Sequence, residues 1–483
     1  MRIFEMILLG GGLLASGLFI FGHRRRWLDT TTVIILLVLY SLHAVLEGIR
    51  IQMAPAYGLD VVLLIVGLIR IVHPVVAPNR HLYRTKRILL TVLVLAVSSV
   101  AVYVSNLLPV FTMPQPTGSY AIGTTVQHLT DDSREETLTS ETGDKRELMV
   151  NVWYPVDPET VVGRQTETYP SELGKAISLV FGIPKILFSQ TSLIHTHVVS
   201  DIAISKAQAE YPVVLFSPGV RSTRFQSMTA IEELVSRGYI VVGIDHPYTS
   251  AEVSFPDGRT ATYKPDPTGI TSSELYAYNV IGVGIRAADA SFVLDTLTEW
   301  QKQDPQGLLT GRIDLNRVGM FGHSYGGATT AEVLATDSRF KAGLSLEGGF
   351  WGKVAHTDLQ QPFMYLITGK TARSLDPTVK EKDDVFYEQF AGDLNRVMTN
   401  SKNDTYYAKV APFFHQSFTD LALIAPALFA KEIDPIRNID ITRAYTAAFF
   451  DQYLKGEAQS LLKSTSIAYP EVKFDQTYTR IQH

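Results

Sequence analysis

The stretch RVGMFGHSYG, residues 317–326, decides the expected fold. Its first half, Arg317–Phe321, is a short apolar run that predicts a β-strand, and Ala328–Ala335 predicts a helix. Between them, Gly322–Gly326 fits the pattern G-x-S-x-G, in which glycines let the chain turn sharply and keep the serine hydroxyl clear of neighbouring side chains. Three fixed residues occur by chance, but the flanking strand and helix are the context that this turn requires. We therefore identify Ser324 as the candidate nucleophile.

Strands and helices alternate on both sides of this turn. Further apolar runs predict strands at Leu148–Tyr154, Pro212–Phe216, Tyr239–Ile244, Lys341–Leu346, Phe363–Thr368 and Tyr406–Val410. Helical patterns occur at Ala287–Trp300 and Ile441–Leu454. This alternation predicts an α/β fold over residues 118–483, with a doubly wound, mostly parallel sheet that has helices on both faces.

A serine hydroxyl is a weak nucleophile and needs a base. In folds that carry this turn, the acid and then the histidine follow the serine along the chain. Three histidines follow Ser324. His483 is the last residue of the sequence, where chains are poorly ordered, and His356 is too near the candidate acid to sit on a separate loop. His415 follows the strand-like segment Tyr406–Val410, so we predict it as the base.

The acid must orient the imidazole and stabilise its charged form. Two loops could supply it. Glu347 directly follows the strand Lys341–Leu346. The loop after Phe363–Thr368 is the commoner location, but its first carboxylate, Asp376, comes several residues late. We predict Glu347 as the acid and keep Asp376 as the alternative.

The negative oxygen that forms during acyl transfer needs two backbone N–H donors. One comes from the residue after the nucleophile, Tyr325, and the other from a loop after an early strand. Ser217-Pro218-Gly219-Val220 fits that loop, and Pro218 has no N–H to offer. The predicted oxyanion hole is therefore Val220 and Tyr325, and the turn around the nucleophile is built by Gly322, His323 and Gly326.

Composition excludes several chemistries. The sequence has no cysteine, which excludes disulfides, thiolate zinc sites and a cysteine nucleophile. His195 and His197 have no acidic or histidine companions placed as ligands, so we predict no metal and no cofactor. The net charge of −5 gives no basic surplus for a nucleic-acid partner. Asp245-His246 ends a strand and is expected to form structural hydrogen bonds.

The segment Leu173–Ile194 is apolar although it lies outside any predicted strand. Such a segment either covers the core or forms a lid over an acyl pocket, and both interpretations stay open at this point. We therefore mark a candidate lid around residues 171–205.

Residues 1–112 have a different character, with four long apolar runs at Met6–Phe21, Thr31–Val45, Val61–Val76 and Ile88–Phe111. A helix that spans the hydrocarbon takes about 20 apolar residues. Arg70 interrupts the third run, and a charge near a helix centre costs roughly 2.5–3.5 kcal/mol unless its side chain reaches the interface. We predict a bundle of four transmembrane helices before the catalytic domain, with three spans as the alternative.

Loop charges set the expected orientation. Basic residues gather between the first and second runs (Arg24, Arg25, Arg26) and between the third and fourth (Arg80, Arg84, Lys86, Arg87). The loop between the second and third runs has only Arg50. Lys and Arg mark the cytoplasmic side. Four spans satisfy every loop, so we predict a multi-pass protein of the cell membrane with residues 118–483 outside the cytoplasm.

From about Thr124 onward the chain resembles the platelet-activating-factor acetylhydrolase family, in its plasma or type II branch. The blocks that carry the resemblance are Thr130–Glu136, Met149–Pro155, Tyr211–Gly219, Gly322–Thr329 and His415–Phe418, while Tyr445–Gly456 is also similar to the closing helix of dienelactone-hydrolase-like proteins. The resemblance implies the α/β-hydrolase fold. The family has Asp where Glu347 stands, which is a departure. The membrane segment lies outside the resemblance, which indicates a bacterial, membrane-anchored relative.

The resemblance implies calcium-independent hydrolysis of carboxylic esters with short or truncated acyl chains. An ester or phospholipid substrate and the membrane are then the expected partners. A cutinase- or polyester-type esterase shares the same turn and is the alternative enzyme. A third interpretation is a non-catalytic membrane protein that uses the fold as a binding module, and the joint presence of Ser324, Glu347 and His415 argues against it.

Overall fold

The computed structural model describes residues 1–73, 80–375 and 385–481. The chain divides into two compact units. The first unit consists of Met1–Thr112 together with Pro184–Ile194, and the second of Met113–Ile183 and His195–His483. The assignment of Pro184–Ile194 to the first unit was not expected, because the sequence places this segment inside the candidate lid.

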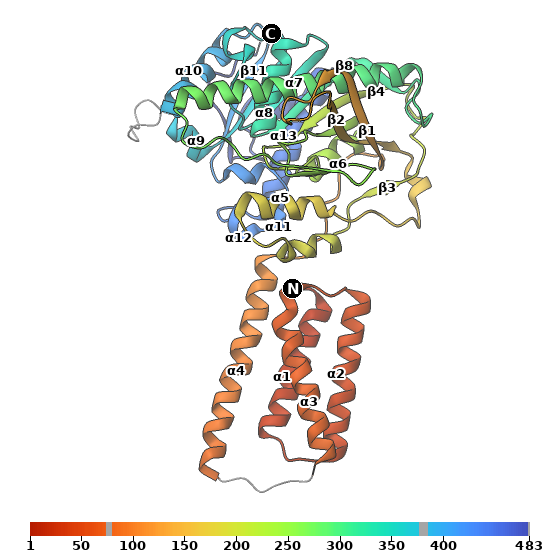
Figure 1. The fold of residues 1–483 in the computed structure, drawn as a ribbon, viewed down its shortest axis with the longest axis vertical. Helices are drawn as coiled ribbons and strands as arrows, with labels where there is room; N and C mark the ends of the chain where they lie inside the picture. The colour runs from red at the N-terminus through yellow and green to blue at the C-terminus, as the bar shows by residue number, and fades with distance from the viewer. Residues whose placement is uncertain (74–79, 376–384, 482–483) are drawn as a thin grey trace. The chain divides into compact units, whose positions relative to one another are not determined.

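The first unit contains four long helices that lie lengthwise beside one another (Figure 1). They are α1 (Ile3–Phe21), α2 (Arg26–Leu46), α3 (Ala54–Val72) and α4 (Arg80–Leu107), with a 3₁₀ turn η1 (Ile51–Met53) before α3. All four are long and apolar enough to cross a membrane. The doubtful third run reaches this length because α3 begins at Ala54, with Pro55 in its first turn, and not at Val61.

Two arginines inside the first unit form ion pairs with buried carboxylates. The guanidinium of Arg50 donates to Glu5 at 2.6 Å and to the carbonyl of Leu108 at 2.8 Å. Arg70, which interrupts the third apolar run, donates to Asp29 of α2 at 3.0 Å. A buried charge is tolerated when it is paired and its hydrogen bonds are satisfied. These pairs therefore fix the helices against one another.

The segment Pro184–Ile194 joins the first unit through polar contacts. It forms the 3₁₀ turns η3 (Lys185–Leu193). The Gln52 side chain in η1 donates to the carbonyl of Leu187 at 2.6 Å and to the Gln190 side chain at 2.8 Å. Gln190 is fully buried, so these hydrogen bonds hold the segment where water is excluded.

The second unit is built on a ten-stranded sheet with the order β12-β11-β10-β9-β8-β4-β5-β2-β1-β3. The six strands from β11 to β5 are parallel, while β2 is antiparallel to both β5 and β1, and β12 is antiparallel to β11. The bounds are β1 (Ala121–Glu135), β2 (Lys145–Val156), β3 (Val198–Ser200), β4 (Tyr211–Ser217), β5 (Ile240–Asp245), β8 (Ile313–His323), β9 (Phe340–Leu346), β10 (Phe363–Thr368), β11 (Thr405–Val410) and β12 (Val472–Phe474). A separate hairpin pairs β6 (Glu252–Ser254) with β7 (Thr260–Thr262).

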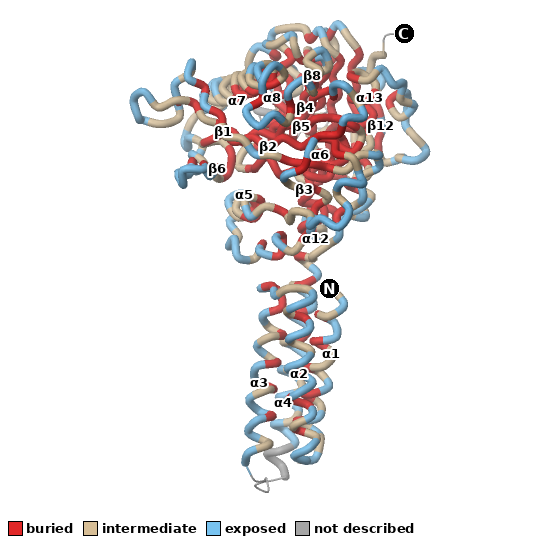
Figure 2. Tube along the Cα trace, turned by 90° about the vertical axis from the view of Figure 1, so that its right-hand side faces the viewer, coloured by how far each residue is buried: buried red, intermediate tan, exposed pale blue. Residues whose placement is uncertain are grey.

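Helices cover both faces of this sheet. On one face α6 (Met228–Ser236) and α13 (Pro435–Leu454) pack together, and on the other α7 (Ser272–Lys302) packs on α8 (Tyr325–Thr336). The smaller helices are α5 (Ser171–Phe181), α9 (Gly369–Ser374), α10 (Val385–Asn400), α11 (Leu421–Ile424) and α12 (Pro426–Phe429), and the other 3₁₀ turns are η2 (Pro158–Val161), η4 (Lys353–His356), η5 (His415–Phe418) and η6 (Ser460–Leu462). Buried positions concentrate on the central strands (Figure 2).

The predicted fold class is confirmed: a mostly parallel, doubly wound sheet that follows four apolar helices. Each predicted strand occurs, with ends that differ by a few residues. Helix α7 begins at Ser272 and not at Ala287, and its start is marked by a capping box in which Thr271 and Glu274 bond each other's backbone. Strand β1 is not among the strands predicted from apolar runs. The strands β3, β6, β7 and β12 were not predicted either, because three residues carry no periodicity.

Candidate active site

Ser324 stands at the turn between β8 and α8. Its backbone has φ 55° and ψ −120°, a strained conformation for a residue with a side chain. The turn closes because two neighbours are glycines. A Cβ at Gly326 would collide with the carbonyl oxygen of Ser217, and one at Gly322 with that of Gly326. The sequence therefore places the serine on the sharp turn that the motif predicts.

Glu347 and His415 meet at the same edge of the sheet. Glu347 follows β9 directly, with φ 58°, and His415 begins η5 just after β11. The Nδ1 of His415 lies 2.6 Å from Oε2 of Glu347. The other carboxylate oxygen accepts the backbone N–H of Thr368 at 3.0 Å and its hydroxyl at 2.7 Å. The alternative acid, Asp376, lies outside the described residues.

The electrostatics of Glu347 favour the ionised form. Burial raises its pKa, but the hydrogen bond and charge of His415 and the hydroxyls of Thr368 and Thr371 outweigh burial and leave the pKa below its usual value. Ionised Glu347 therefore adds stability at neutral pH, and this contribution is lost as the pH falls through the lowered pKa. A carboxylate at this place holds the Nδ1–H of His415, which leaves Nε2 as the free acceptor.

One pocket of about 540 Å³ brings the predicted site residues together. Ser324, Glu347, His415, Val220 and Tyr325 all line it. Much of the remaining wall is aromatic and comes from Trp351, Phe390 and Phe414. Within the described residues no hydrogen bond joins the side chains of Ser324 and His415. Such bonds are often long before substrate binds.

The loop after β4 has one N–H that is bonded to a protein acceptor and another that is not. The N–H of Gly219 donates to the Gln226 side chain at 2.9 Å, and the carbonyl of Pro218 accepts from Arg286 at 2.7 Å. The N–H groups of Val220 and Tyr325 have no acceptor among the described residues. Both donors of the predicted oxyanion hole are therefore without a protein acceptor in the part of the chain that the structure describes.

A directional chain of hydrogen bonds links this loop to the histidine loop. The Gln226 Nε2 lies 3.1 Å from Nδ1 of His323, and His323 Nε2 lies 2.8 Å from the carbonyl oxygen of His415. A carbonyl only accepts, so His323 carries its proton on Nε2 and accepts from Gln226 at Nδ1. Burial and the charge of His415 hold the pKa of His323 well below its usual value, which keeps the ring neutral.

Sequence reasoning missed Gln226. Its side chain accepts from the oxyanion loop and donates to the residue before the nucleophile, while its backbone carbonyl accepts from the N–H of Asp420 at 3.1 Å. No motif marks such a residue, because its partners come from three distant parts of the sequence.

A smaller cavity of about 230 Å³ lies on another side of Ser324. Ser324, His323 and His415 line it together with apolar residues of α5, namely Leu173, Ala176, Ile177, Val180 and Phe181. The part of the candidate lid that belongs to the second unit thus borders the nucleophile. An apolar cavity at this place suits a small apolar group of a ligand.

A second serine–histidine–aspartate arrangement lies fully buried. The Ser217 hydroxyl is 3.0 Å from Nε2 of His246, whose Nδ1 is 2.8 Å from Asp289. Burial and the charge of Arg286 lower the pKa of His246 to about 4, so the ring is neutral at pH 7. All three side chains are closed to solvent, and Asp289 is further bound by Arg146 at 2.6 Å. This network anchors the start of the oxyanion loop and has no access to substrate.

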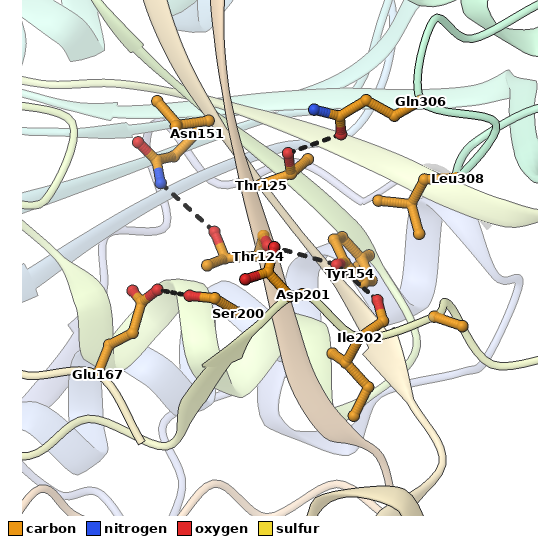
Figure 3. A pocket seen from close by; sticks show the side chains of 12 residues that line it. Thr124, Thr125, Asn151, Tyr154, Glu167, Ser200, Asp201, Ile202, Gln306 and Leu308 are labelled. Atoms are coloured by element: carbon orange, nitrogen blue, oxygen red, sulfur yellow. Dashed lines mark hydrogen bonds between the residues drawn. The ribbon is translucent and has the colours of Figure 1, made fainter. Parts of the chain in front are cut away.

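Another cavity, of about 580 Å³, lies at the strand edge formed by β1, β2 and β3 (Figure 3). Its polar groups largely bond one another: Asn151 donates to Thr124 at 3.4 Å and Thr125 to Gln306 at 2.9 Å. Tyr154 donates to a backbone carbonyl at 2.8 Å. None of its described lining residues is a histidine, and the Ser200 hydroxyl in its wall donates to the carboxylate of Glu167.

Comparison with known proteins identifies the family. A family model described as platelet-activating factor acetylhydrolase, isoform II, matches residues 108–460. The chain belongs to this family. The resemblance seen in the sequence is thereby confirmed, and the protein is a carboxylic ester hydrolase. All four N-terminal helices, which end at Leu107, lie outside the matched residues.

Individual relatives agree. The chain is 25% identical over 390 residues to a probable 1-alkyl-2-acetylglycerophosphocholine esterase from Arthroderma benhamiae, covering 75% of this chain and 94% of the relative. It is 24% identical to a platelet-activating factor acetylhydrolase from Cavia porcellus, covering 71% and 78%. A ferulic acid esterase structure from Streptomyces cinnamoneus superimposes with a TM-score of 0.61 at 28% identity, covering 76% of this chain and 100% of that one.

Replacing Gln226 tests whether its hydrogen bonds position the loop after β4 and the turn at Ser324. Gln226→Leu removes the acceptor of Gly219 N–H and the donor to His323, so the oxyanion loop and the turn lose their common support. We expect kcat for p-nitrophenyl acetate to fall roughly 10- to 100-fold, with KM little changed, because small misplacements of catalytic groups act on the transition state. Steady-state kinetics on the purified variant measures the split.

Two further variants sharpen this result. Gln226→Glu keeps an acceptor for the Gly219 N–H, and its carboxylate can accept from Nδ1 of His323 when that ring is protonated. Its activity should therefore exceed that of Gln226→Leu. This advantage should be lost as the pH rises, because His323 then loses the added proton. Gln127→Leu removes a glutamine on β1 that bonds only Thr125 at 3.4 Å, away from the pocket, and should behave like the native protein. Equal kinetics for Gln226→Leu and Gln127→Leu would exclude a positioning role.

Proposed function

We propose that the protein cleaves carboxylic esters through an acyl-enzyme, with Ser324 as nucleophile, His415 as base and Glu347 as acid. The observation that carries this proposal is the 2.6 Å hydrogen bond between His415 and Glu347 in the pocket that Ser324 lines. A base that is oriented by a buried carboxylate beside a strained serine is the arrangement that nucleophilic catalysis requires.

In this mechanism His415 Nε2 takes the proton of Ser324 as Oγ attacks the carbonyl carbon of the ester. The resulting imidazolium is stabilised by Glu347, whose lowered pKa keeps it ionised. The same proton then passes to the leaving alcohol. Water, deprotonated by His415, then attacks the carbonyl carbon of the acyl-serine. As the bond from that carbon to Oγ breaks, His415 returns the proton to Oγ of Ser324, and the carboxylic acid is released.

The negative oxygen of each tetrahedral intermediate is proposed to bind the N–H groups of Val220 and Tyr325. Both residues line the pocket, and neither N–H has an acceptor among the described residues. The Gly219 N–H is already given to Gln226. Donors fixed by the fold stabilise the transition state without further reorganisation.

The proposed substrates are esters with short or truncated acyl chains, including phospholipids similar to platelet-activating factor. The names of the two relatives support this class. The apolar cavity of about 230 Å³ beside Ser324 supports it as well, because its size suits a short acyl chain better than a long one. The apolar N-terminal helices would hold the enzyme where lipid esters are available.

A second candidate is hydrolysis of aromatic or polymeric esters, as in cutinase- or polyester-type enzymes. Tyr325, Trp351, Phe390 and Phe414 line the larger pocket, and aromatic walls bind aromatic groups well. The ferulic acid esterase whose fold superimposes on this chain supports this candidate too.

We also propose that the second unit faces the outside of the cytoplasm. Four helices are long enough to span, and Arg24–Arg26 and Arg84–Arg87 mark the ends that would face the cytoplasm. An even number of spans then returns the chain to the outer side after α4.

The triad assignment predicts the behaviour of two variants. Ser324→Ala should lower kcat for p-nitrophenyl acetate roughly 10⁴-fold or more, because the nucleophile and base act as a unit. It should also abolish labelling by a fluorophosphonate probe. Glu347→Gln should lower kcat roughly 10³- to 10⁴-fold, because the imidazolium loses its counter-charge.

Asp376→Asn is the matched control, since it changes the alternative acid by the same substitution. It should retain nearly native activity. A large loss in Asp376→Asn together with little loss in Glu347→Gln would move the acid to the later loop. Retained labelling in Ser324→Ala would refute the nucleophile.

Acyl selectivity separates the two substrate classes. We expect kcat/KM to fall along the series acetyl, butyryl, octanoyl and palmitoyl, because the cavity beside Ser324 holds only a small apolar group. Methyl ferulate, assayed with the same preparation, represents the aromatic class. A maximum at palmitoyl would contradict the short-chain proposal, and a clear preference for the feruloyl ester would favour the second candidate.

Protease accessibility tests the orientation. In intact spheroplasts, added protease should remove the second unit, because four spans place it outside. The same cells after lysis provide the reference for total cleavage. Full protection before lysis would mean that the unit faces the cytoplasm.

A further inference from the structure

The first unit contains an apolar groove that ester hydrolysis does not use. It lies between α1, α3 and α4 and has a volume of about 610 Å³. Its walls are aliphatic side chains, among them Leu59, Val62 and Val66 of α3 and Leu90, Leu93 and Val97 of α4. The groove is the size of a lipid chain and lies wholly within the apolar helices.

The groove runs lengthwise along α3 and α4. On α4 the lining extends from Lys86 to Val97, which at 1.5 Å per residue is about 16 Å. On α3 it extends from Val66 to Pro55 in the first turn of the helix. A chain that entered at the Lys86 end would therefore lie along the helices toward the first turn of α3.

One end of the groove is basic. Lys86 and Arg87 line it there, and the guanidinium of Arg87 lies 5.7 Å from the ring of Phe21. Arg70 lies near the same end, where it donates to the carbonyl of Phe19 at 2.9 Å. Basic pockets between membrane helices bind anionic lipid head groups. The charge thus complements a phosphate and the walls complement a chain.

A glycine keeps the groove open. Gly58 lies in α3 and lines the groove, and a Cβ at this position would have no atom within 4 Å. Glycine is an unfavourable residue in the interior of a helix. A side chain at Gly58 would therefore meet no atom at its Cβ, and a large one would extend into the space of the groove.

We propose that this groove binds one acyl chain of an anionic phospholipid, with the phosphate against Lys86 and Arg87. The lipid comes from the leaflet on the side of the basic loops. It is bound at a site separate from the catalytic pocket, so the inference does not depend on the triad.

The full-length protein tests this directly. After reconstitution into vesicles with equal amounts of phosphatidylcholine and phosphatidylglycerol, native mass spectrometry should show one retained phosphatidylglycerol per chain, in several-fold preference over phosphatidylcholine. Gly58→Leu should reduce this retention several-fold. Gly17→Leu is the matched control, because Gly17 is a helical glycine of α1 with open space around its Cβ and does not line the groove. It should retain lipid like the native chain.

A second pair of variants tests the charges. Lys86→Gln with Arg87→Gln should abolish the preference for phosphatidylglycerol, whereas Arg24→Gln with Arg25→Gln, which removes two positive charges between α1 and α2, should not. Unchanged hydrolysis of p-nitrophenyl acetate would show that each variant is folded. Equal retention of both lipids by the native protein, or equal loss in Gly58→Leu and Gly17→Leu, would overturn the proposal. A dimer that carries no lipid would do so too, because a second copy would then fill the groove.

Discussion

The hydrogen bond between Glu347 and His415 depends on a single constraint, which is that β8, β9, β10 and β11 are parallel neighbours in the sheet. Parallel strands end at the same edge, so the residues that follow them line up in sheet order. Ser324 follows β8, Glu347 follows β9, Thr368 ends β10 and His415 comes after β11. Thr368 ends β10, the strand between β9 and β11, and its hydroxyl donates to the carboxylate of Glu347. The order of the strands thus brings the backbones of these residues together, whatever rotamers their side chains adopt.

Much of this could be read from the sequence, because local patterns carry it. The turn at Ser324 has a motif, Glu347 directly follows an apolar run, and only three histidines follow the serine. Their catalytic roles stay predictions. Gln226 could not be found, since its partners Gly219, His323 and Asp420 meet it only in the folded chain. A hydrogen bond between distant residues leaves no period and no spacing in the sequence.

The four apolar N-terminal helices show the same limit. In the sequence, Arg70 counted against the third apolar run as a span, because a hydropathy scale scores each charged residue without regard to a partner. In the structure it bonds Asp29, a residue 41 positions away. Two charges that each disfavour burial become compatible with it once they are paired. Likewise Glu5 and Arg50 are both buried and bonded to each other at 2.6 Å. A sequence scan that scores residues singly cannot anticipate such compensation.

The segment Pro184–Ile194 has a consequence for how this protein could be divided or recombined. It belongs to the first unit although both of its chain neighbours belong to the second. A truncated protein that starts at Met113 would keep the segment and lose Gln52, its hydrogen-bond partner, leaving buried Gln190 and Phe188 without their surroundings. The second unit therefore cannot be separated from the first by a single cut in the chain. Fusing it to other helices requires redesign of Pro184–Ile194, or transfer of the N-terminal helices that contact this segment.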